Sequence, residues 1–484
     1  MPHEILINVG AAEVRVAVVA EGRLEALSAS RTLGSEGPSS LVGDIVLGRV
    51  IRVLPAVQAA FVEIGRERAG FLGAREAKSL KPGLEGDPAI SELMRDGETL
   101  LVQIVKDPIG DKGARLTTSV TIPGRHCVLT PFQAGVAISR RIEDEAERAR
   151  LALLGEELLA GSQHGLILRT AAVGVTAGEL QADLEQLRRE WLEIGAAVGT
   201  AKVPSTLRRD LGPVERALRD IVRQDTVRIL IDDAPALERA RAYCRQAVPD
   251  VEDRIVLFAG PGGLFDELEN DIDALTHPRV ELACGGWITL EGTEALTAVD
   301  VNSGSFVQAS AIEDTGLAVN LEAAAEIGRQ VRLRGIGGLI VVDFIHMLDP
   351  GHVERVHQVL AQSLARDSTP FNIAPATAFG LTEITRKRVR EPLVELWSEH
   401  CPHCGGLGHV RRAEAVAMEA VRRIEASGRA APGKPIRLCA APEVAAWLEA
   451  EGAAAALSRK GVARLEIIAD ESFSRERLEV SSGD

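Results

Sequence analysis

The sequence predicts a multidomain protein of the α/β and β classes, in which a β-barrel and a further module interrupt an α/β domain. Residues 3–30 have the pattern of three short strands, and residues 214–275 alternate helices and strands as if continuing them. The stretch 44–121 between them has β character throughout. Farther on, the apolar runs 296–299 and 339–342 each end in an aspartate, a second α/β signature.

Length and composition fit a globular protein without a membrane partner. The chain has 484 residues, enough for roughly three or more domains, with 46% hydrophobic and 26% charged residues. It has no apolar run long enough to span a bilayer and no secretory signal, so we expect a cytoplasmic protein. Six cysteines do not make a disulfide framework, and four of them are expected to be small core residues: Cys127, Cys244, Cys284 and Cys439.

The net charge of −15 argues, taken alone, against a nucleic-acid partner. Basic residues nevertheless cluster at 140–141, 329–334 and 386–390, so a local basic groove on an acidic body stays open. For the cluster at 329–334 the alternative is a helix carboxyl terminus, where cations are favoured.

The β-rich stretch carries two phenylalanines that suit base stacking. Period-two alternation places Phe61 on the wet face of its strand, and Phe71 begins the next strand. A small barrel with surface phenylalanines is how an OB-fold stacks unpaired bases. Lys106 and Lys112 could meet the phosphate backbone. The alternative is that each phenylalanine belongs to the barrel core.

The next module, about residues 121–210, contains a possible phosphate site. A strand at 165–170 ends in Arg169 and Thr170, whose guanidinium and hydroxyl together suit a phosphate. A capping box at 176–179 then predicts a helix start. The alternative for Arg169 is ordinary solvation at a strand end. An apolar stripe is expected along the helix, made of Leu180, Leu184, Leu187, Trp191 and Ile194.

The runs ending in Asp300 and Asp343 predict a catalytic centre. They read as buried strands of an α/β sheet, and ligands of such sheets bind beyond the strands' carboxyl ends. Each carboxylate there needs a cation or hydrogen-bond donors. Two together suit Mg²⁺, and Asn302 is placed to orient one of them. The alternative is that both aspartates are strand-end caps or solvated turn residues.

Cys401 and Cys404 form a C-x-x-C followed by glycines, which is half of a closed structural zinc site. The chain contains no second C-x-x-C. Either a histidine (His400, His403 or His409) completes the site, or a second copy of the chain does. After residue 413, an Ala-rich helix and a β-α-β pattern predict a small terminal domain.

Taken together, these stretches resemble the ribonuclease E/G family of bacterial endoribonucleases over essentially the whole chain. The G-like branch is favoured because nothing long and disordered follows the catalytic body. The matching marks are Gln58-Ala-Ala-Phe61-Val, Gly70-Phe71-Leu, Lys112-Gly-Ala, Ile138-Ser-Arg140-Arg141-Ile, Leu168-Arg169-Thr170-Ala, Val299-Asp300-Val-Asn302-Ser, Asn320-Leu-Glu322-Ala-Ala, Gly338-Leu-Ile-Val-Val-Asp343-Phe and Cys401-Pro-His-Cys404.

The resemblance implies a particular order of domains. It comprises an RNase H-like domain in two parts (1–37 and 213–278), an OB-fold RNA-binding insertion (38–120), a 5′-sensor insertion (121–212), a DNase I-like catalytic domain (279–399), a zinc link (400–412) and a small dimerisation domain (413–484).

The resemblance also implies roles for the site residues. Asp300 and Asp343 would hold the catalytic magnesium with help from Asn302, and Cys401 and Cys404 would share one zinc with a partner subunit. Two further sets would bind RNA: Phe61, Phe71 and Lys112 the single strand, and Gly124, Val128, Arg169 and Thr170 its 5′-monophosphate.

The implied function is endonucleolytic cleavage of single-stranded RNA in ribosomal RNA processing and RNA decay, leaving 5′-phosphate products. The implied assembly is a homodimer, with a tetramer left open. One departure from ribonuclease E is Ala378, where that enzyme carries an arginine, which puts one phosphate contact in doubt. Two other functions stay open at this point: a non-catalytic RNA-binding scaffold, and a metal phosphoesterase acting on DNA or small molecules.

Overall fold

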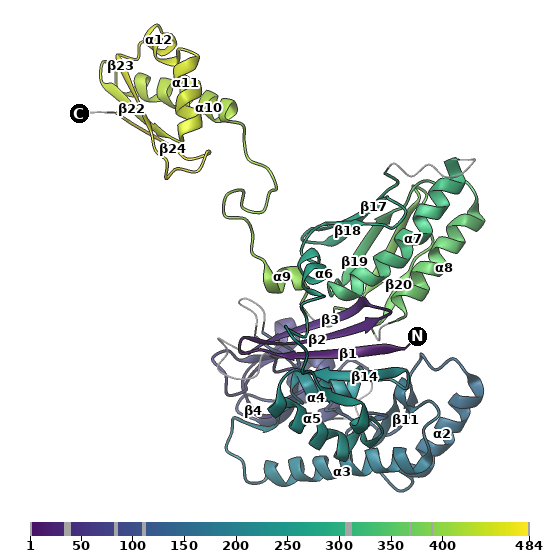
Figure 1. Cartoon of the computed structure of the whole chain (residues 1–484). Helices are drawn as coiled ribbons and strands as arrows, with labels where there is room; N and C mark the ends of the chain where they lie inside the picture. The colour runs from purple at the N-terminus through teal and green to yellow at the C-terminus, as the bar shows by residue number, and fades with distance from the viewer. Residues whose placement is uncertain are drawn as a thin grey trace. The chain divides into compact units, whose positions relative to one another are not determined.

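The computed structural model describes residues 2–32, 40–81, 86–108, 113–304, 312–366, 369–388 and 391–482. The chain forms two compact units, Met1–Leu393 and Val394–Asp484, which are treated separately here (Figure 1). Within the described ranges, none of the helices combines the length and the apolar character that a membrane crossing requires.

The first sheet of the larger unit joins the two ends of the interrupted α/β region. Its strand order is β15-β14-β1-β2-β3, and β14 runs parallel to β1 although more than 200 residues separate them in sequence. A tight turn at Glu21 and Gly22, both at positive φ, connects β2 to β3. The sheet is therefore built from two segments that are far apart in the chain, as the sequence predicts. Its elements are β1 (His3–Val9), β2 (Glu13–Ala20), β3 (Arg23–Arg31), α4 (Pro213–Asp220), β14 (Thr226–Ile231), α5 (Ala234–Ala247) and β15 (Ile255–Leu257).

The second sheet closes into a small barrel. Strand β4 pairs with both β5 and β7, and the pairings between these two run β5-β6-β8-β7. A sixth strand, β13 (Ser205–Arg208), pairs with β4 at the edge. The barrel strands are β4 (Ile45–Leu54), β5 (Ala59–Glu63), β6 (Gly70–Gly73), β7 (Thr99–Lys106) and β8 (Arg115–Thr117). The expectation of β structure throughout is wrong at two places. A 3₁₀ helix, Pro55–Val57, lies between β4 and β5, and the 3₁₀ helix Ala74–Leu80 and helix α1 (Ile90–Leu93) lie between β6 and β7. The latter two contribute buried residues to the barrel core, so the connection between β6 and β7 covers the barrel.

A third sheet, in the order β11-β12-β10-β9, packs against the long helix α3 (Ala177–Val198). The predicted capping box is confirmed: the Thr176 amide donates to Glu179 Oε2 at 2.9 Å, and the Glu179 amide donates to Thr176 Oγ1 at 3.3 Å. Four residues of the predicted stripe are buried, and Trp191 is partly buried against them. The other elements are β9 (Ile122–Pro123), β10 (Cys127–Thr130), β11 (Gly135–Ile138), α2 (Glu145–Leu159) and β12 (Gly165–Leu168).

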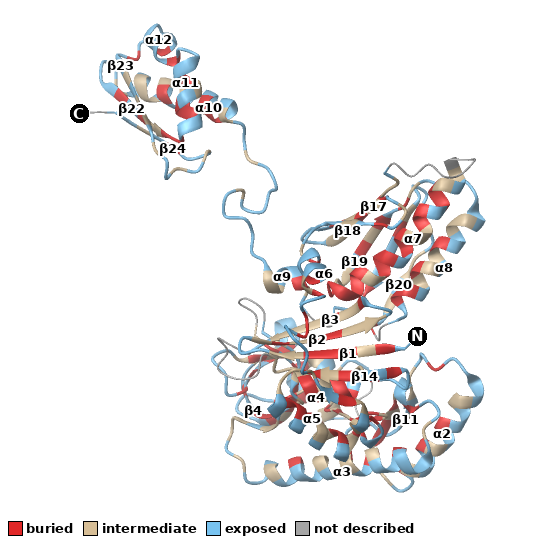
Figure 2. Cartoon of the chain, in the orientation of Figure 1, coloured by how far each residue is buried: buried red, intermediate tan, exposed pale blue. Residues whose placement is uncertain are grey.

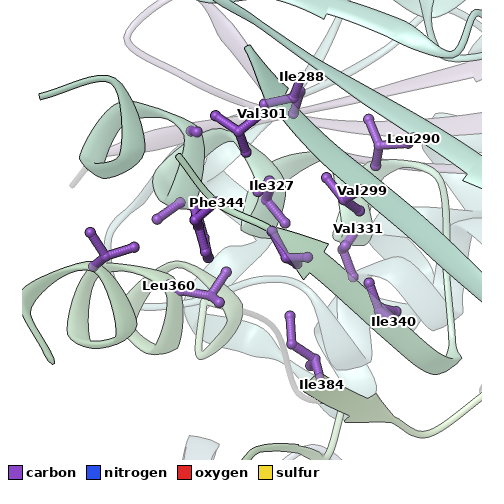
Figure 3. Packing of buried hydrophobic residues seen from close by; sticks show 14 of the residues in the cluster. Ile288, Leu290, Val299, Val301, Ile327, Val331, Ile340, Phe344, Leu360 and Ile384 are labelled. Carbon is purple, nitrogen blue, oxygen red and sulfur yellow. The ribbon is translucent and has the colours of Figure 1, made fainter. Parts of the chain in front are cut away.

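The fourth sheet carries the two predicted catalytic aspartates. Its order is β16-β17-β18-β19-β21-β20, with β18 and β19 parallel. Helices α7 and α8 share one apolar core with it, which includes Ile327 of α7 and Val299 of β18, and Leu360 of α8 near Phe344 just after β19 (Figure 3). The elements are β16 (Arg279–Glu281), β17 (Trp287–Gly292), β18 (Leu296–Asn302), α7 (Ile312–Leu333), β19 (Gly338–Asp343), α8 (Pro350–Leu364), β20 (Phe371–Ile373) and β21 (Leu381–Arg386).

The expectation that the runs 296–299 and 339–342 form buried strands holds for only one face of each strand. Val299 and Val342 are buried, but their neighbours Asp300 and Asp343 are exposed. Figure 2 shows β18 and β19 coloured only in part as buried. The physical reason is that both helices contribute to a single core on one side of the sheet, so the strands alternate as in a half-covered sheet. The aspartates therefore lie on the open face.

The basic cluster at 329–334 does not form a groove in the described structure. Arg329 Nη1 donates to the Leu24 carbonyl at 2.7 Å, Arg332 Nη2 donates to Glu25 at 2.8 Å, and Arg334 Nη1 donates to the His277 carbonyl at 2.7 Å. Arg386 is likewise buried and donates to the Ile336 carbonyl. These guanidinium groups connect α7 and β21 to their neighbours, while Arg390 lies outside the described residues.

The smaller unit has a three-stranded sheet in the order β23-β22-β24, packed on helices. The expected β-α-β pattern is present, since β22 and β23 are parallel with α11 and α12 between them. Among the four cysteines predicted as core residues, Cys127 and Cys244 are buried but Cys284 and Cys439 are partly exposed. The elements are α10 (Ala413–Ala430), β22 (Pro435–Ala440), α11 (Pro442–Ala450), α12 (Ala453–Ser458), β23 (Arg464–Ala469) and β24 (Leu478–Ser482).

Candidate functional site

Asp300 and Asp343 lie side by side at the ends of β18 and β19. They are register partners in this parallel pair, and both are exposed. Asn302 follows two residues after Asp300, so it points to the same face, and its Nδ2 donates to Asp300 Oδ2 at 2.7 Å. The three residues predicted to form the catalytic centre are thus gathered on one edge of the open face.

A buried asparagine holds the chain just beyond Asp343. Asn320 of α7 is fully buried, its Nδ2 donates to the Ile345 carbonyl at 2.7 Å, and its Oδ1 accepts from the Ile345 amide at 3.0 Å. This two-way bond ties the end of β19 to a helix that is itself packed in the core. The position of the Asp343 carboxylate is therefore set by rigid elements and not by a loop.

The carboxylate pair fits a magnesium ion. No group of three or more His, Cys, Asp or Glu side chains arranged for a metal occurs in the described part of the chain. Mg²⁺ is commonly held by one or two carboxylates while it keeps several waters and takes phosphate oxygens of the substrate. Two exposed carboxylates, one oriented by an amide donor, match this requirement.

The two phenylalanines of the barrel lie together on its outside. Phe61 of β5 pairs in register with Phe71 of β6, and their rings are 6.1 Å apart in an edge-to-face arrangement of 74°. Phe61 is 38% exposed, whereas its neighbour Val62 is buried, so Phe61 is not a core residue. Phe71 is partly exposed. Lys112 lies outside the described residues.

Arg169 and Thr170 follow β12, beside Gly124 in the loop that precedes β10. Val128 lies in β10 itself, in register with Ile167 of β12. The Arg169 amide donates to the His126 carbonyl at 2.8 Å, which places the two segments next to each other. Arg169 Nη1 donates to the Gly124 carbonyl at 2.6 Å, and the Thr170 hydroxyl lies 3.2 Å from that of Ser139. All four predicted phosphate-binding residues are therefore brought together.

Gly124 contributes to this site in a way that the sequence did not suggest. Its amide donates to the Cys127 carbonyl at 2.8 Å, so its carbonyl is the group turned to Arg169. A Cβ atom at this position would lie 2.5 Å from Asp183 Oδ1, which explains the glycine. Asp183 of α3 also accepts the His126 amide at 2.8 Å and the Cys127 amide at 3.0 Å. The loop is thus fixed by α3.

Cys401 and Cys404 form a compact turn in the smaller unit. The Gly405 amide donates to the Cys401 carbonyl at 2.8 Å, and the Leu407 amide donates to the Cys404 carbonyl at 3.1 Å. Backbone N–H groups of Cys404 and His403 lower the pKa of the Cys401 thiol, which favours the metal-binding thiolate. The pair fits zinc as two of its four ligands.

A profile described as "Ribonuclease E/G family" matches residues 121–389, a range that includes Arg169, Thr170 and the two aspartates predicted to be catalytic. The chain belongs to the ribonuclease E/G family. It is therefore an endoribonuclease. A second profile, "RNase E/G, Thioredoxin-like domain", matches residues 400–483. The terminal region predicted as a small dimerisation domain is thus similar to a thioredoxin-like domain of the same family.

Individual relatives agree with the family assignment. Ribonuclease G of Escherichia coli (strain K12) is 37% identical over 460 residues, which covers 93% of both chains. Ribonuclease G of Haemophilus influenzae is 38% identical over 430 residues, or 87% of both chains. Ribonuclease E of Nostoc is 40% identical over 377 residues, which covers 77% of this chain and 55% of the relative.

Two residues near these sites were missed by the sequence analysis. Asp183 lies in the expected helix of the predicted sensor module, but nothing in the pattern indicates that its carboxylate accepts loop amides. Asp220 accepts a hydrogen bond from Arg169 Nη2 at 2.7 Å across 51 residues of sequence. The sequence did contain one indication of the role of Asp220. An acidic residue at the carboxyl end of a helix is disfavoured by the helix dipole, so its presence there suggests a compensating interaction with a cation.

Proposed function

We propose that this chain is a magnesium-dependent, 5′-end-sensing endoribonuclease of the cytoplasm. It cuts single-stranded RNA in ribosomal RNA processing and RNA decay, and it leaves 5′-phosphate products. The observation that carries the proposal is the register pairing of Asp300 with Asp343 on the open face of their sheet. Family membership identifies the reaction class as endonucleolytic cleavage of RNA. The Asp300 and Asp343 carboxylates are the site at which we propose that it takes place.

The side chains divide the chemical task. Asp300 and Asp343 would hold the ion through their carboxylates, while the hydrogen bond from the Asn302 amide to Asp300 Oδ2 keeps that carboxylate oriented. Magnesium bound there would supply a lowered pKa of a bound water and stabilisation of charge on the scissile phosphate. The Asn320 bonds to Ile345 keep Asp343 in place against the repulsion between the two carboxylates.

The barrel phenylalanines and the Arg169–Thr170 site determine which RNA is bound. The Phe61 and Phe71 rings offer faces on which unpaired bases stack, which explains a preference for single strands. Lys112 would add a backbone contact. The Arg169 guanidinium and the Thr170 hydroxyl receive a 5′-monophosphate beside Gly124 and Val128. Ala378 lies in the exposed turn before Leu381, the register partner of Asp343, so it leaves space where ribonuclease E carries an arginine.

The proposal extends to domains and assembly. The split sheet corresponds to the RNase H-like domain, the barrel to the OB-fold insertion, the β9–β12 module to the 5′-sensor, and the sheet of β16–β21 to the DNase I-like domain. Two chains share one zinc through Cys401 and Cys404 of each copy, which gives a homodimer. The boundaries are those predicted from the sequence.

Cleavage of a defined oligonucleotide tests the function. The substrate has a single-stranded centre and a 5′-monophosphate, and cleavage is followed with magnesium and with EDTA. The proposal expects magnesium-dependent cuts in the RNA, a 5′-phosphate on the downstream fragment, and little cleavage of the same sequence as DNA or as duplex. Equal cleavage of DNA would favour the phosphoesterase alternative. Binding without cleavage would favour the scaffold.

A further inference from the structure

The Arg169 guanidinium is fixed by the protein on two sides. Its Nη1 donates to the Gly124 carbonyl at 2.6 Å, and its Nη2 donates to Asp220 Oδ1 at 2.7 Å. Because the guanidinium is planar and its donors point in fixed directions, two acceptors on separate nitrogens determine the orientation of the whole group. The remaining N–H groups are left for a ligand.

Asp220 is itself held firmly. Arg219 donates to both of its carboxylate oxygens, from Nε to Oδ1 at 3.0 Å and from Nη2 to Oδ2 at 2.9 Å. The Arg219 side chain is only 5% exposed, and its Nη1 also donates to Asp210 Oδ1 at 3.2 Å. A two-bond pair with a buried arginine gives Asp220 little freedom to rotate. It therefore acts as a fixed anchor for Arg169.

The location of Asp220 is unfavourable unless another interaction compensates. It is the last residue of α4, where the partial negative charge of the helix end disfavours a carboxylate. Burial also opposes its ionisation, yet the hydrogen bond and charge of Arg219, with the charge of Arg169, hold the pKa of Asp220 below its usual value. The carboxylate is thus ionised and kept beside Arg169.

We propose that Asp220 is a positioning residue for 5′-end recognition, which sets the plane of the Arg169 guanidinium so that its free N–H groups meet the terminal phosphate. This inference rests on the proposed function, since it presupposes that Arg169 binds the 5′-monophosphate. It adds α4, a helix that shares the apolar core of the first sheet, to the elements that recognise the 5′ end of the RNA.

The charge of Asp220 and its positioning role predict opposite effects on 5′-monophosphate binding when the carboxylate is removed. A carboxylate this close to an anion site repels phosphate, so charge alone predicts that its removal strengthens binding of the 5′-monophosphate. Positioning predicts the reverse, because an unanchored arginine loses part of its affinity to the entropy of ordering its side chain. The direction of the measured change therefore distinguishes the two.

The experiment compares Asp220→Asn and Asp220→Ala with the unchanged protein and with Arg169→Ala. Matched RNAs carrying a 5′-monophosphate or a 5′-hydroxyl are cleaved, and KM and kcat are measured for each. Asp220→Asn keeps the shape and one carbonyl acceptor, so it should lose part of the preference. Asp220→Ala should lose about tenfold, mainly through a higher KM for the monophosphate RNA. Cleavage of the 5′-hydroxyl RNA should change by much less than cleavage of the monophosphate RNA.

Glu215→Gln is the matched control, because it removes the same charge from the first turn of the same helix, away from Arg169. It should leave the preference unchanged. Melting temperatures show whether Asp220→Ala loses the fold, in which case the isosteric Asp220→Asn decides.

A stronger monophosphate preference, or an unchanged one, in folded Asp220→Asn overturns the positioning role. The outcome remains distinct from failure of the proposed function. If the unchanged protein shows no preference, or Arg169→Ala retains it, end sensing by Arg169 is wrong. If Arg169→Ala abolishes the preference and neither Asp220 variant reduces it, the end sensing stands and only the inference fails.

Discussion

Asp300 and Asp343 are register partners across the parallel strands β18 and β19, and both side chains are exposed. Partner residues of neighbouring strands lie about 5 Å apart at their backbones and point to the same face. Two carboxylates so placed repel each other, and a divalent cation removes that repulsion. This relationship makes the strand ends a metal site in the proposed mechanism.

Replacing either aspartate by asparagine should abolish cleavage while leaving the fold and RNA binding nearly intact. The reason is that the substitution removes one charged ligand on an exposed face and opens no cavity. Cleavage rates, melting temperature and binding of single-stranded RNA measure the three effects. Glu291→Gln is a suitable control, since Glu291 is exposed and pairs with Ala298 on the same face of the sheet. Substantial cleavage by both aspartate variants would contradict the mechanism.

The sequence predicted the elements well because their signals are local. The capping box at Thr176, the three short strands of residues 3–30, and the alternation around Phe61 each depend on a few neighbouring residues. The one-sided burial of β18 and β19 was not predicted because it depends on where α7 and α8 lie. An apolar run such as 339–342 does not reveal that its helices cover a single face.

Long-range polar contacts could not be predicted for a similar reason. The bond from Arg169 to Asp220 and the bonds from Arg332 to Glu25 join residues far apart in sequence. A run of arginines at 329–334 looks the same whether it faces RNA or neighbouring carbonyls. In the structure, Arg329, Arg332 and Arg334 all donate to protein acceptors. The motif residues at the sites were recoverable, and so was Asn302 beside Asp300, whereas Asp183 and Asp220, which act across long stretches of sequence, were not.

Arg169→Ala should erase the preference for a 5′-monophosphate and spare basal cleavage of 5′-hydroxyl RNA. Each charge-assisted hydrogen bond to the phosphate contributes about 1.5–3 kcal/mol, so the loss should be about tenfold or more. A 5′-triphosphate should be cut more slowly than the monophosphate because of its bulk. Rates on the three RNAs check this, with Arg189→Ala, an exposed arginine of α3, as the control. Continued discrimination by Arg169→Ala would show that the end is read elsewhere.

Phe61→Ala and Phe71→Ala should each weaken binding of single-stranded RNA, by about 1–3 kcal/mol for each base that stacks. Because the two rings contact each other, the double variant should lose less than the sum of the single losses. Fluorescence anisotropy with an unpaired oligonucleotide measures the affinities. Phe132→Ala is the matched control, since Phe132 is 41% exposed and also packs edge-to-face on an aromatic ring, that of Trp191. An equal effect of Phe132→Ala would mean that the barrel pair has no special role.

Cys404→Ser should release zinc and shift the protein from dimers toward monomers. In the proposed assembly each chain supplies two thiolates, and because a closed tetrahedral site needs four ligands, identical pairs meeting near a two-fold axis would complete it. Metal analysis of the unchanged protein should give about one zinc per two chains. Sedimentation measures the dimer, and Cys439→Ser, a partly exposed cysteine of the same unit, should change neither result. One zinc per chain would indicate completion by a histidine such as His409, and a dimer that survives the loss of both Cys401 and Cys404 would remove zinc from the interface.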